Sequence, residues 1–91
     1  MEKVKVVKIF DVRTGVSRSS GKEWKSRDVL LESVQNVMHP ERYCARLFGD
    51  AVDKFNAKEG DVIEVAIHHW VNEKNGRCFN EVRIVEFGNN L

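Results

Sequence analysis

The sequence predicts an all-β fold with one short helix, arranged as a five-stranded Greek-key barrel with the helix between strands 3 and 4. Three observations lead to this prediction. Several segments alternate apolar and polar residues with the two-residue period of a β-strand. One segment, beginning at Asp50, has the spacing of a short amphipathic helix. Asn75-Gly76 is a strong hairpin signal, because a type I′ turn requires positive φ at both central positions.

The first predicted strand covers residues 4–12 and is rich in β-branched side chains. Its alternation breaks at residues 6–7 and again at residues 9–10, which is typical of a bulged and strongly bent strand. A long bent strand suits a small barrel, because it can pair with a neighbour on each side. The polar, glycine-bounded residues 14–22 are predicted to form a hairpin loop.

The second and third strands are predicted over residues 23–32 and 42–48, with a loop of no clear period between them. Alternation places these apolar residues of the two strands inward: Val29, Leu31, Tyr43, Ala45 and Leu47. The opposite face then carries Trp24, Arg46 and Phe48. Two aromatic residues and an arginine are therefore expected on one outer surface.

The helix is predicted to start with Asp50 as its N-cap. At about two turns it is too short to be stable alone in water, so we expect it to plug the open end of the barrel. The fourth and fifth strands follow. Ile63, Val65 and Ile67 of the fourth are predicted to point inward, and the fifth carries the apolar residues Phe79, Val82 and Ile84. Trp70 and Phe79 are interpreted as core or subunit-contact residues rather than binding platforms.

A five-stranded barrel with a helix between its third and fourth strands is the arrangement of the OB-fold, whereas an SH3-like barrel usually lacks that helix. The 91 residues have room for one modest core. Residues 1–88 are therefore predicted to form a single OB-fold domain, and residues 89–91 a short C-terminal tail. No apolar run approaches the roughly 20 residues of a membrane span, and the N-terminal segment lacks a signal peptide's apolar core, so we expect a cytoplasmic protein.

Few features of the sequence suggest catalysis or metal binding. Cys44 and Cys78 form no CxxC pair, so they are interpreted as buried or half-buried thiols. His68 and His69 point to opposite faces of a strand and are not expected to share a metal ion. No nucleophile–base pair or glycine-rich phosphate loop is recognisable. We expect neither an enzyme nor a cofactor.

The chain resembles a family of short bacterial and phage domains of unknown function that are taken to be OB-fold proteins. The matching landmarks are Thr14-Gly15, residues 21–25, Leu31-Glu32, residues 47–50, residues 58–62, residues 75–77, Phe79 and Val82-Arg83. Where that family commonly has an aromatic residue, this chain has Cys78, and Trp70 is an aromatic that it adds. The segment from Arg46 to Gly60 is also similar to the bacterial single-stranded-DNA-binding protein.

The formal net charge of +1 conceals a basic stretch over residues 13–27, with five basic residues against one acidic, and an acidic stretch over residues 50–64. Exposed rings and a groove lined by cations are what a sequence-tolerant single-strand binder requires. The predicted nucleic-acid-binding residues are Arg13, Arg18, Lys22, Trp24, Lys25, Arg27, Arg46, Phe48, Lys74 and Arg77.

The expected partner is single-stranded DNA, bound without catalysis in replication, recombination or repair. RNA stays open, because stacking does not distinguish the sugars. A homo-oligomer is also expected, because a single OB-fold binds only about 4–16 nucleotides. The alternative is an OB-fold protein-interaction or assembly module without nucleic-acid binding, which the near-neutral charge favours.

Overall fold

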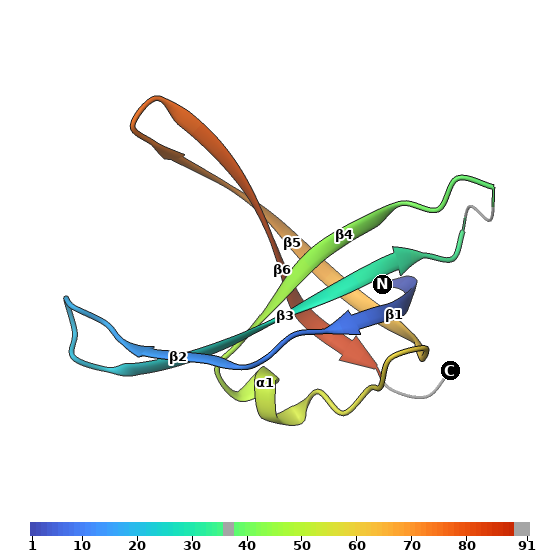
Figure 1. Cartoon of the computed structure of the whole chain (residues 1–91), viewed down its shortest axis with the longest axis horizontal. Coiled ribbons are helices and arrows are strands. Elements are labelled where there is room, and N and C mark those ends of the chain that lie inside the picture. Colours follow the sequence, from blue (N-terminus) through green and yellow to red (C-terminus); the bar gives the residue numbers. More distant parts are fainter. Residues whose placement is uncertain (36–37, 89–91) are drawn as a thin grey trace.

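The structure is a computed structural model and describes residues 1–35 and 38–88. These residues are mostly β, with one short helix and a single six-stranded sheet (Figure 1). The tail predicted over residues 89–91 lies outside the described residues. In chain order the elements are β1 (Glu2–Ile9), β2 (Arg13–Val16), β3 (Glu23–Ser33), β4 (Arg42–Phe48), α1 (Asp50–Lys54), β5 (Val62–Lys74) and β6 (Arg77–Gly88).

β1 pairs along both of its edges, as the sequence predicts for its first strand. It runs antiparallel to β3 on one side and to β5 on the other. Its register with β3 shifts between Val6 and Lys8, at the first of the two predicted breaks in alternation. At this bulge the amide of Val6 donates to the carbonyl of Asp61, and the amide of Gly60 donates to the carbonyl of Val6. The turn that precedes β5 is thereby attached to β1.

The strand pairings close on themselves. β1 pairs with β5, β5 with β6, β6 with β4, β4 with β3, and β3 with β1. All of these pairs are antiparallel except β4 with β6, which run parallel and have one register pair, Arg46 opposite Arg83. The result is a ring of five strands with one sparsely paired junction, which we call the β4–β6 seam.

The predicted number of five strands is wrong, because an additional strand, β2, follows the first one. β1 ends at Ile9, at the second predicted break, and the chain resumes as β2 at Arg13. Residues 14–16 of β2 belong to the stretch 14–22 that was expected to be loop, but β2 pairs antiparallel with the start of β3. The polar composition of this stretch obscured its pairing, since a strand exposed on both faces has no apolar alternation.

The core lies inside the ring and consists mainly of the residues predicted to face inward. β1 also contributes to it, as do α1 and the segment after it (Figure 1). Tyr43, Ile67 and Val82 pack at its margin and are half-buried. The buried hydrophobic residues are Val4, Val6, Val29, Leu31, Ala45, Leu47, Val52, Phe55, Ala57, Ile63, Val65 and Ile84.

α1 begins differently from the prediction, because Gly49 and not Asp50 is the N-cap. Gly49 has a φ of 59°, and no side chain caps the helix. A positive φ is readily accessible only to glycine, which lets the chain turn sharply after β4. Beyond the helix, the Phe55 ring packs edge-to-face on Phe87, with 5.2 Å between the centroids. Val52 is the buried residue of the helix, and Phe55 and Ala57 just after it also belong to the core.

Two hairpins extend away from the ring (Figure 1). The first, formed by β2 and the start of β3, is called the β2–β3 arm; the second, formed by the end of β5 and the start of β6, is the β5–β6 arm. The tip of the second arm is the predicted tight turn, with positive φ at Asn75 (53°) and Gly76 (74°). Among the described residues, no helix has the length and apolar content that a membrane span needs.

Candidate functional site

The surface between the two arms is built from the outer faces of β3, β4, β5 and β6. Ser26 lies opposite Phe48, and Asp28 opposite Arg46, so these four side chains share the face turned away from the core. Trp24 is two residues before Ser26 and extends the same face into the β2–β3 arm. Trp24, Arg46 and Phe48, which the sequence places together on one outer surface, are therefore together there. We call this surface the outer face.

Trp24 is 43% exposed and rests on the β2–β3 arm. Gly15 is its cross-strand partner, and a Cβ added at Gly15 would come within 2.5 Å of the indole ring. The ring therefore packs directly against the backbone at Gly15. Trp24 and Phe48 both line an open pocket of about 620 Å³, which continues over β2 and the turn at Gly49.

An arginine stands between two aromatic rings in the middle of the outer face. The guanidinium carbon of Arg83 is 4.2 Å from the centroid of the Phe48 ring and 4.0 Å from that of Trp70. Both distances fall within the range of cation–π attraction. Because β6 lies between β4 and β5, Arg83 links the two aromatic residues across three strands. His68 packs edge-on against Trp70 at 4.4 Å and extends this group, which we call the aromatic–arginine stack.

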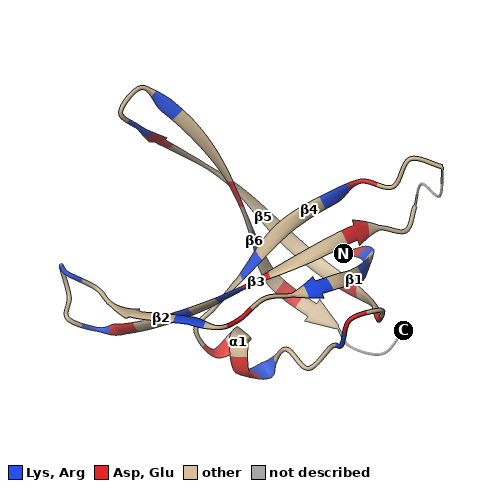
Figure 2. Cartoon of the chain, in the orientation of Figure 1, with Lys and Arg blue, Asp and Glu red and all other residues tan. Residues whose placement is uncertain are grey.

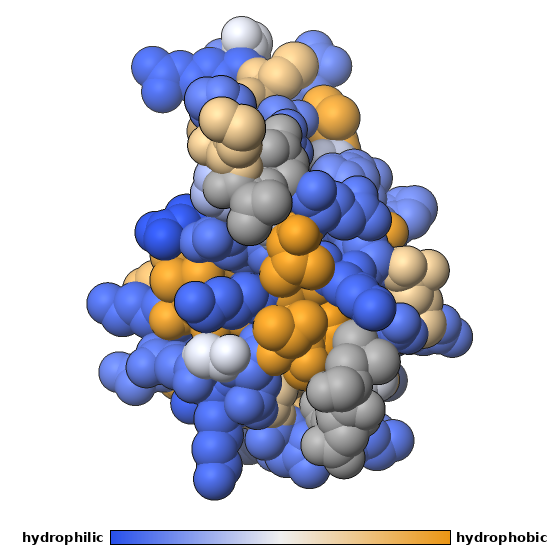
Figure 3. Space-filling view, turned by 90° about the vertical axis from the view of Figure 1, so that its right-hand side faces the viewer, coloured by the Kyte–Doolittle hydropathy of each residue, from blue (hydrophilic) through white to orange (hydrophobic). Residues whose placement is uncertain are grey.

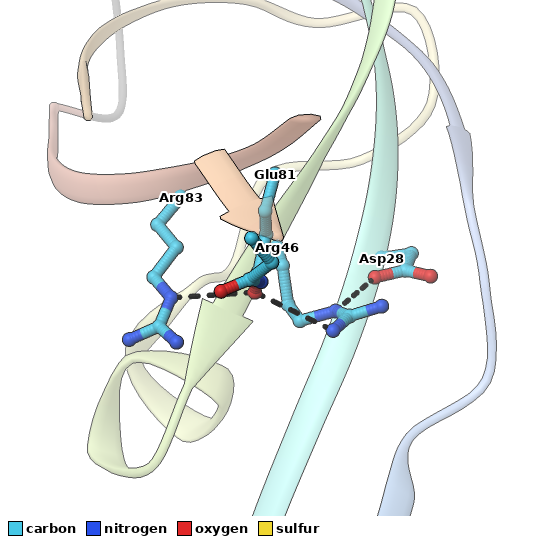
Figure 4. A network of polar contacts seen from close by, with 5 residues as sticks. Asp28, Arg46, Glu81 and Arg83 are labelled. Carbon is cyan, nitrogen blue, oxygen red and sulfur yellow. Dashed lines mark hydrogen bonds and ion pairs between the residues drawn. The ribbon is translucent and has the colours of Figure 1, made fainter. Parts of the chain in front are cut away.

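Two carboxylates face the arginines of the outer face (Figure 4). Nε of Arg46 donates to Oδ1 of Asp28 at 2.9 Å, and its Nη1 lies 3.5 Å from Oε1 of Glu81. Nε of Arg83 lies 3.4 Å from the same Glu81 oxygen. The hydrogen bond to Asp28, with the charges of both carboxylates, raises the pKa of Arg46 despite its partial burial. Arg46 is thus permanently charged but already paired.

The side chains of Lys25 and Arg27, two of the predicted site residues, point away from the outer face, although Lys25 contributes to the lining of the pocket beside Trp24. Arg27 lies opposite the buried Leu47, and its Nε donates to the carbonyl of Phe10 at 2.6 Å. Lys25 forms an ion pair with Asp53 of α1. Alternation along β3 explains both positions, because residues 25 and 27 point opposite to residues 24, 26 and 28. The predicted basic stretch is therefore divided between two faces.

The other predicted cations lie on the arms. They are exposed and form no ion pair with any described residue. Arg13 lies on the outer face of β2, opposite Ser26. Figure 2 shows basic residues on both arms and acidic residues on α1. The arm cations are Arg13, Arg18, Lys22, Lys74 and Arg77.

Sequence reasoning missed part of this surface. Arg83 and Glu81 were not expected to contribute, although alternation with the inward Ile84 and Val82 points both of them outward. Trp70, interpreted as a core or subunit-contact residue, lies half-buried in the aromatic–arginine stack. The core interpretation of Phe79 is wrong, because its side chain is 50% exposed on the β5–β6 arm. That arm extends beyond the ring, so its alternation marks no core.

The cysteines also differ from the prediction. Cys44 and Cys78 are both exposed free thiols rather than buried ones. Partial burial, followed by the charge of Asp28, raises the pKa of the Cys44 thiol. In the part of the chain that the structure describes, no group of three or more His, Cys, Asp or Glu side chains is placed to hold a metal ion.

Comparison with known proteins gives one match. Neither the curated proteins nor the solved structures include a significant match to this chain. A family described as a domain of unknown function, DUF3127, matches residues 3–86. The matched residues include all of the outer-face residues named above and both arms. The chain therefore belongs to the DUF3127 family.

Proposed function

We propose that the strand ring is an OB-fold barrel and that its outer face binds single-stranded nucleic acid. Three features support the fold proposal: β1 paired on both edges, a helix between β4 and β5, and a ring left sparsely paired at the β4–β6 seam. The OB-fold is a partly open five-stranded Greek-key barrel. In this reading β1 and β2 are one interrupted first strand, and the two arms are the loop regions with which OB-folds bind oligonucleotides.

The observation that carries the functional proposal is the row of rings on the outer face. Trp24, Phe48 and Trp70 come from three strands, and Arg83 stands between the latter two. Aromatic rings and guanidinium planes are the surfaces on which unpaired bases stack, each contributing about 1–3 kcal/mol. Trp24 is the most exposed of the three rings and is the ring on which we expect a base to stack first.

The arm cations support the same proposal from the electrostatic side. None of these five side chains has a counter-ion among the described residues. They lie on the two sides of the outer face, where a strand crossing from one arm to the other would bring its phosphates. Phosphate contacts of this kind release counter-ions, so the affinity would fall as salt rises.

Fluorescence titration with oligo-dT at low salt tests the proposal. Trp70→Phe leaves Trp24 as the sole tryptophan, and Trp24→Phe leaves Trp70, so the two variants report on the two ends of the platform. We expect quenching of Trp24 and a smaller change at Trp70. Unchanged emission and unchanged gel mobility at saturating oligonucleotide would refute the proposal. Oligo-U in a parallel titration distinguishes RNA from DNA.

A matched pair of double variants tests the role of the arm cations. Lys74→Gln with Arg77→Gln should weaken binding and reduce the salt dependence by about 0.7 per lost phosphate contact. Lys3→Gln with Lys5→Gln removes the same charge from β1, which the ring places away from the β4–β6 seam. We expect the second pair to bind almost as the unaltered chain does. Equal losses in both pairs would mean that only net charge matters.

A second candidate is a protein-interaction or assembly module. It is favoured by the pairing of Arg46 with Asp28 and Glu81, which leaves the centre of the outer face less basic than its arginines suggest. Hydrophobic side chains also gather on the surface opposite the arm tips (Figure 3). Light scattering separates the candidates. A stable oligomer that buries Trp24 and does not respond to oligonucleotide would favour this second function.

A further inference from the structure

We infer that Glu81 is an internal competitor for the phosphate groups of the ligand. Its carboxylate lies where two arginines of the outer face converge, which is the position that a phosphate oxygen would occupy. The inference rests on the proposed function and adds to it the residue that limits affinity at the same site.

Glu81 is held in place from three directions. Its Oε1 is 3.5 Å from Nη1 of Arg46 and 3.4 Å from Nε of Arg83, while its Oε2 accepts a hydrogen bond from Nδ2 of Asn72 at 3.1 Å. Its side chain is 19% exposed. A surface carboxylate without such partners would be mobile and hydrated, whereas this one is fixed across three strands, β4, β5 and β6 (Figure 4).

The two arginines differ in what they would lose if Glu81 withdrew. Arg46 would keep its 2.9 Å hydrogen bond to Asp28. Arg83 has no other carboxylate partner among the described residues, and its contact with Glu81 is long for a charge-assisted hydrogen bond. Its guanidinium lies over the rings of both Phe48 and Trp70, and these contacts hold it in place on the outer face. Of the two arginines, Arg83 is therefore the one that would more readily exchange Glu81 for a phosphate of the ligand.

A carboxylate and a phosphate diester both present anionic oxygens that pair with a guanidinium. A ligand phosphate that reaches Arg83 must therefore displace Glu81 or accept repulsion from it. The unaltered chain then makes fewer effective phosphate contacts than its arginines would allow. The salt dependence of its affinity is therefore shallower, by about one phosphate contact, than it would be without Glu81.

The test compares Glu81→Gln with Glu86→Gln in oligo-dT titrations from about 50 to 200 mM salt. Glu86 is an exposed residue of the same strand with no ion pair among the described residues, so the control removes an equal charge. Glu81→Gln keeps an oxygen for Asn72. We expect it to bind several-fold tighter, with a log–log salt slope steeper by about 0.7 for one phosphate gained. Glu86→Gln should stay within about twofold of the unaltered chain, since long-range surface charge is largely screened.

Each result decides between the inference and the function on which it rests. If the unaltered chain binds and Glu81→Gln shows no gain, or a gain that Glu86→Gln matches, the inference is wrong and the proposed function stands. If no variant binds, the proposed function fails as well. Circular dichroism melting checks folding, and Glu81→Ala repeats the test without the Asn72 hydrogen bond. If neither Glu81 variant folds, its role is structural and the inference is overturned.

Discussion

The contact between Gly15 and Trp24 decides how one ring of the outer face is presented. The indole packs against the backbone at Gly15, at a distance that leaves no room for a Cβ. One side of the ring is thus supported by β2 while the side chain stays 43% exposed. Under the proposed function, a ring fixed in this way would lose little conformational freedom if a base stacked on it. Gly15 is therefore a positioning residue for Trp24.

Gly15→Ala should displace the indole without unfolding the chain. The added methyl group would meet the ring at 2.5 Å, and the ring, which is exposed, can move aside. In a Trp70→Phe background we expect a changed Trp24 emission and weaker oligonucleotide binding, approaching that of Trp24→Ala. Gly88→Ala, at a glycine with nothing within 4 Å of the added Cβ, is the control. Identical emission spectra with and without the methyl group would contradict the packing.

Tyr43 provides a pH-dependent contribution to stability. Burial, followed by the hydrogen bond from its hydroxyl to Glu2 and the charge of that carboxylate, raises the pKa of Tyr43. The folded chain therefore holds the phenol proton more tightly than the unfolded chain does. The resulting stabilisation is fully present below the unfolded pKa of about 10 and is lost as pH rises through the folded pKa.

We expect the free energy of unfolding of the unaltered chain to fall more steeply above pH ~10 than that of Tyr43→Phe. Urea unfolding between pH 8 and pH 11, followed by circular dichroism, measures the difference. Other groups that titrate in this range are common to both chains and cancel. A constant difference between the two chains across the whole range would show that the phenol does not titrate differently on folding.

Single-residue alternation predicted which side chains of β3 and β4 share a face, but it did not identify Arg83. The inward residues of a strand are recognisable because they are apolar, and Trp24, Arg46 and Phe48 followed from them by alternation. The contact of Arg83 with Phe48 arises from a parallel neighbour, β4, that lies far away in the sequence, whereas its contact with Trp70 comes from the hairpin partner β5. The sequence around residues 81–83 does not indicate that β4 is a neighbouring strand. The contact with Phe48 is therefore seen only in the fold.

At the scale of elements, α1 and the arms have separate tasks. α1 has five residues, which is too short for a helix to be stable alone in water. It is held by Val52 in the helix and by Phe55 and Ala57 just after it, all of which are buried in the core. Toward their tips, the arms contribute exposed and mostly polar residues, and each arm is there a two-stranded hairpin. The helix therefore contributes to the stability of the ring, whereas the arms contribute to the exposed surface.

Phe55→Ala should destabilise the fold by about 3–5 kcal/mol, because it empties a buried site and removes the contact with Phe87. Phe79→Ala makes the same chemical change on the β5–β6 arm, where the ring is half-exposed, and should cost no more than about 1 kcal/mol. Urea unfolding of the two variants measures both. Equal losses would contradict the separation of core and arm.

β2 is a strand that could not be predicted from this sequence. Short apolar strands with one buried face were located within a few residues, as were the bulge in β1 and the turn at Asn75. β2 has no buried face, and it exists because its backbone pairs with β3. Gly49 as N-cap was also missed, since Asp50 has the better capping side chain, but the turn after β4 requires a positive φ.

At the scale of the whole molecule, stability should be unevenly distributed between ring and arms. In the ring, the strands surround one buried core, whereas residues near the tips of the arms are exposed on both faces. Local opening of an arm exposes little apolar surface and is therefore less costly than opening of the ring.

Native-state hydrogen exchange should show this difference. We expect the slowest amides in β1, β4 and the ring portion of β3, and exchange at least tenfold faster near the tips of both arms, where strand pairing is two-stranded. Saturating oligo-dT should slow exchange in the arms if they enclose the strand. Uniform protection from ring to tip would mean that the arms are fixed by contacts that a single chain does not provide.

The β4–β6 seam carries a thermodynamic consequence. It is the junction with a single register pair, and the residues on its two sides, Arg46 with Phe48 and Glu81 with Arg83, are those of the outer face. A ligand that spans the seam joins the two strands where the backbone joins them least. Such a ligand would bind the folded chain and not the unfolded one, so it would stabilise the fold by mass action. The melting temperature should therefore rise as the ligand concentration rises.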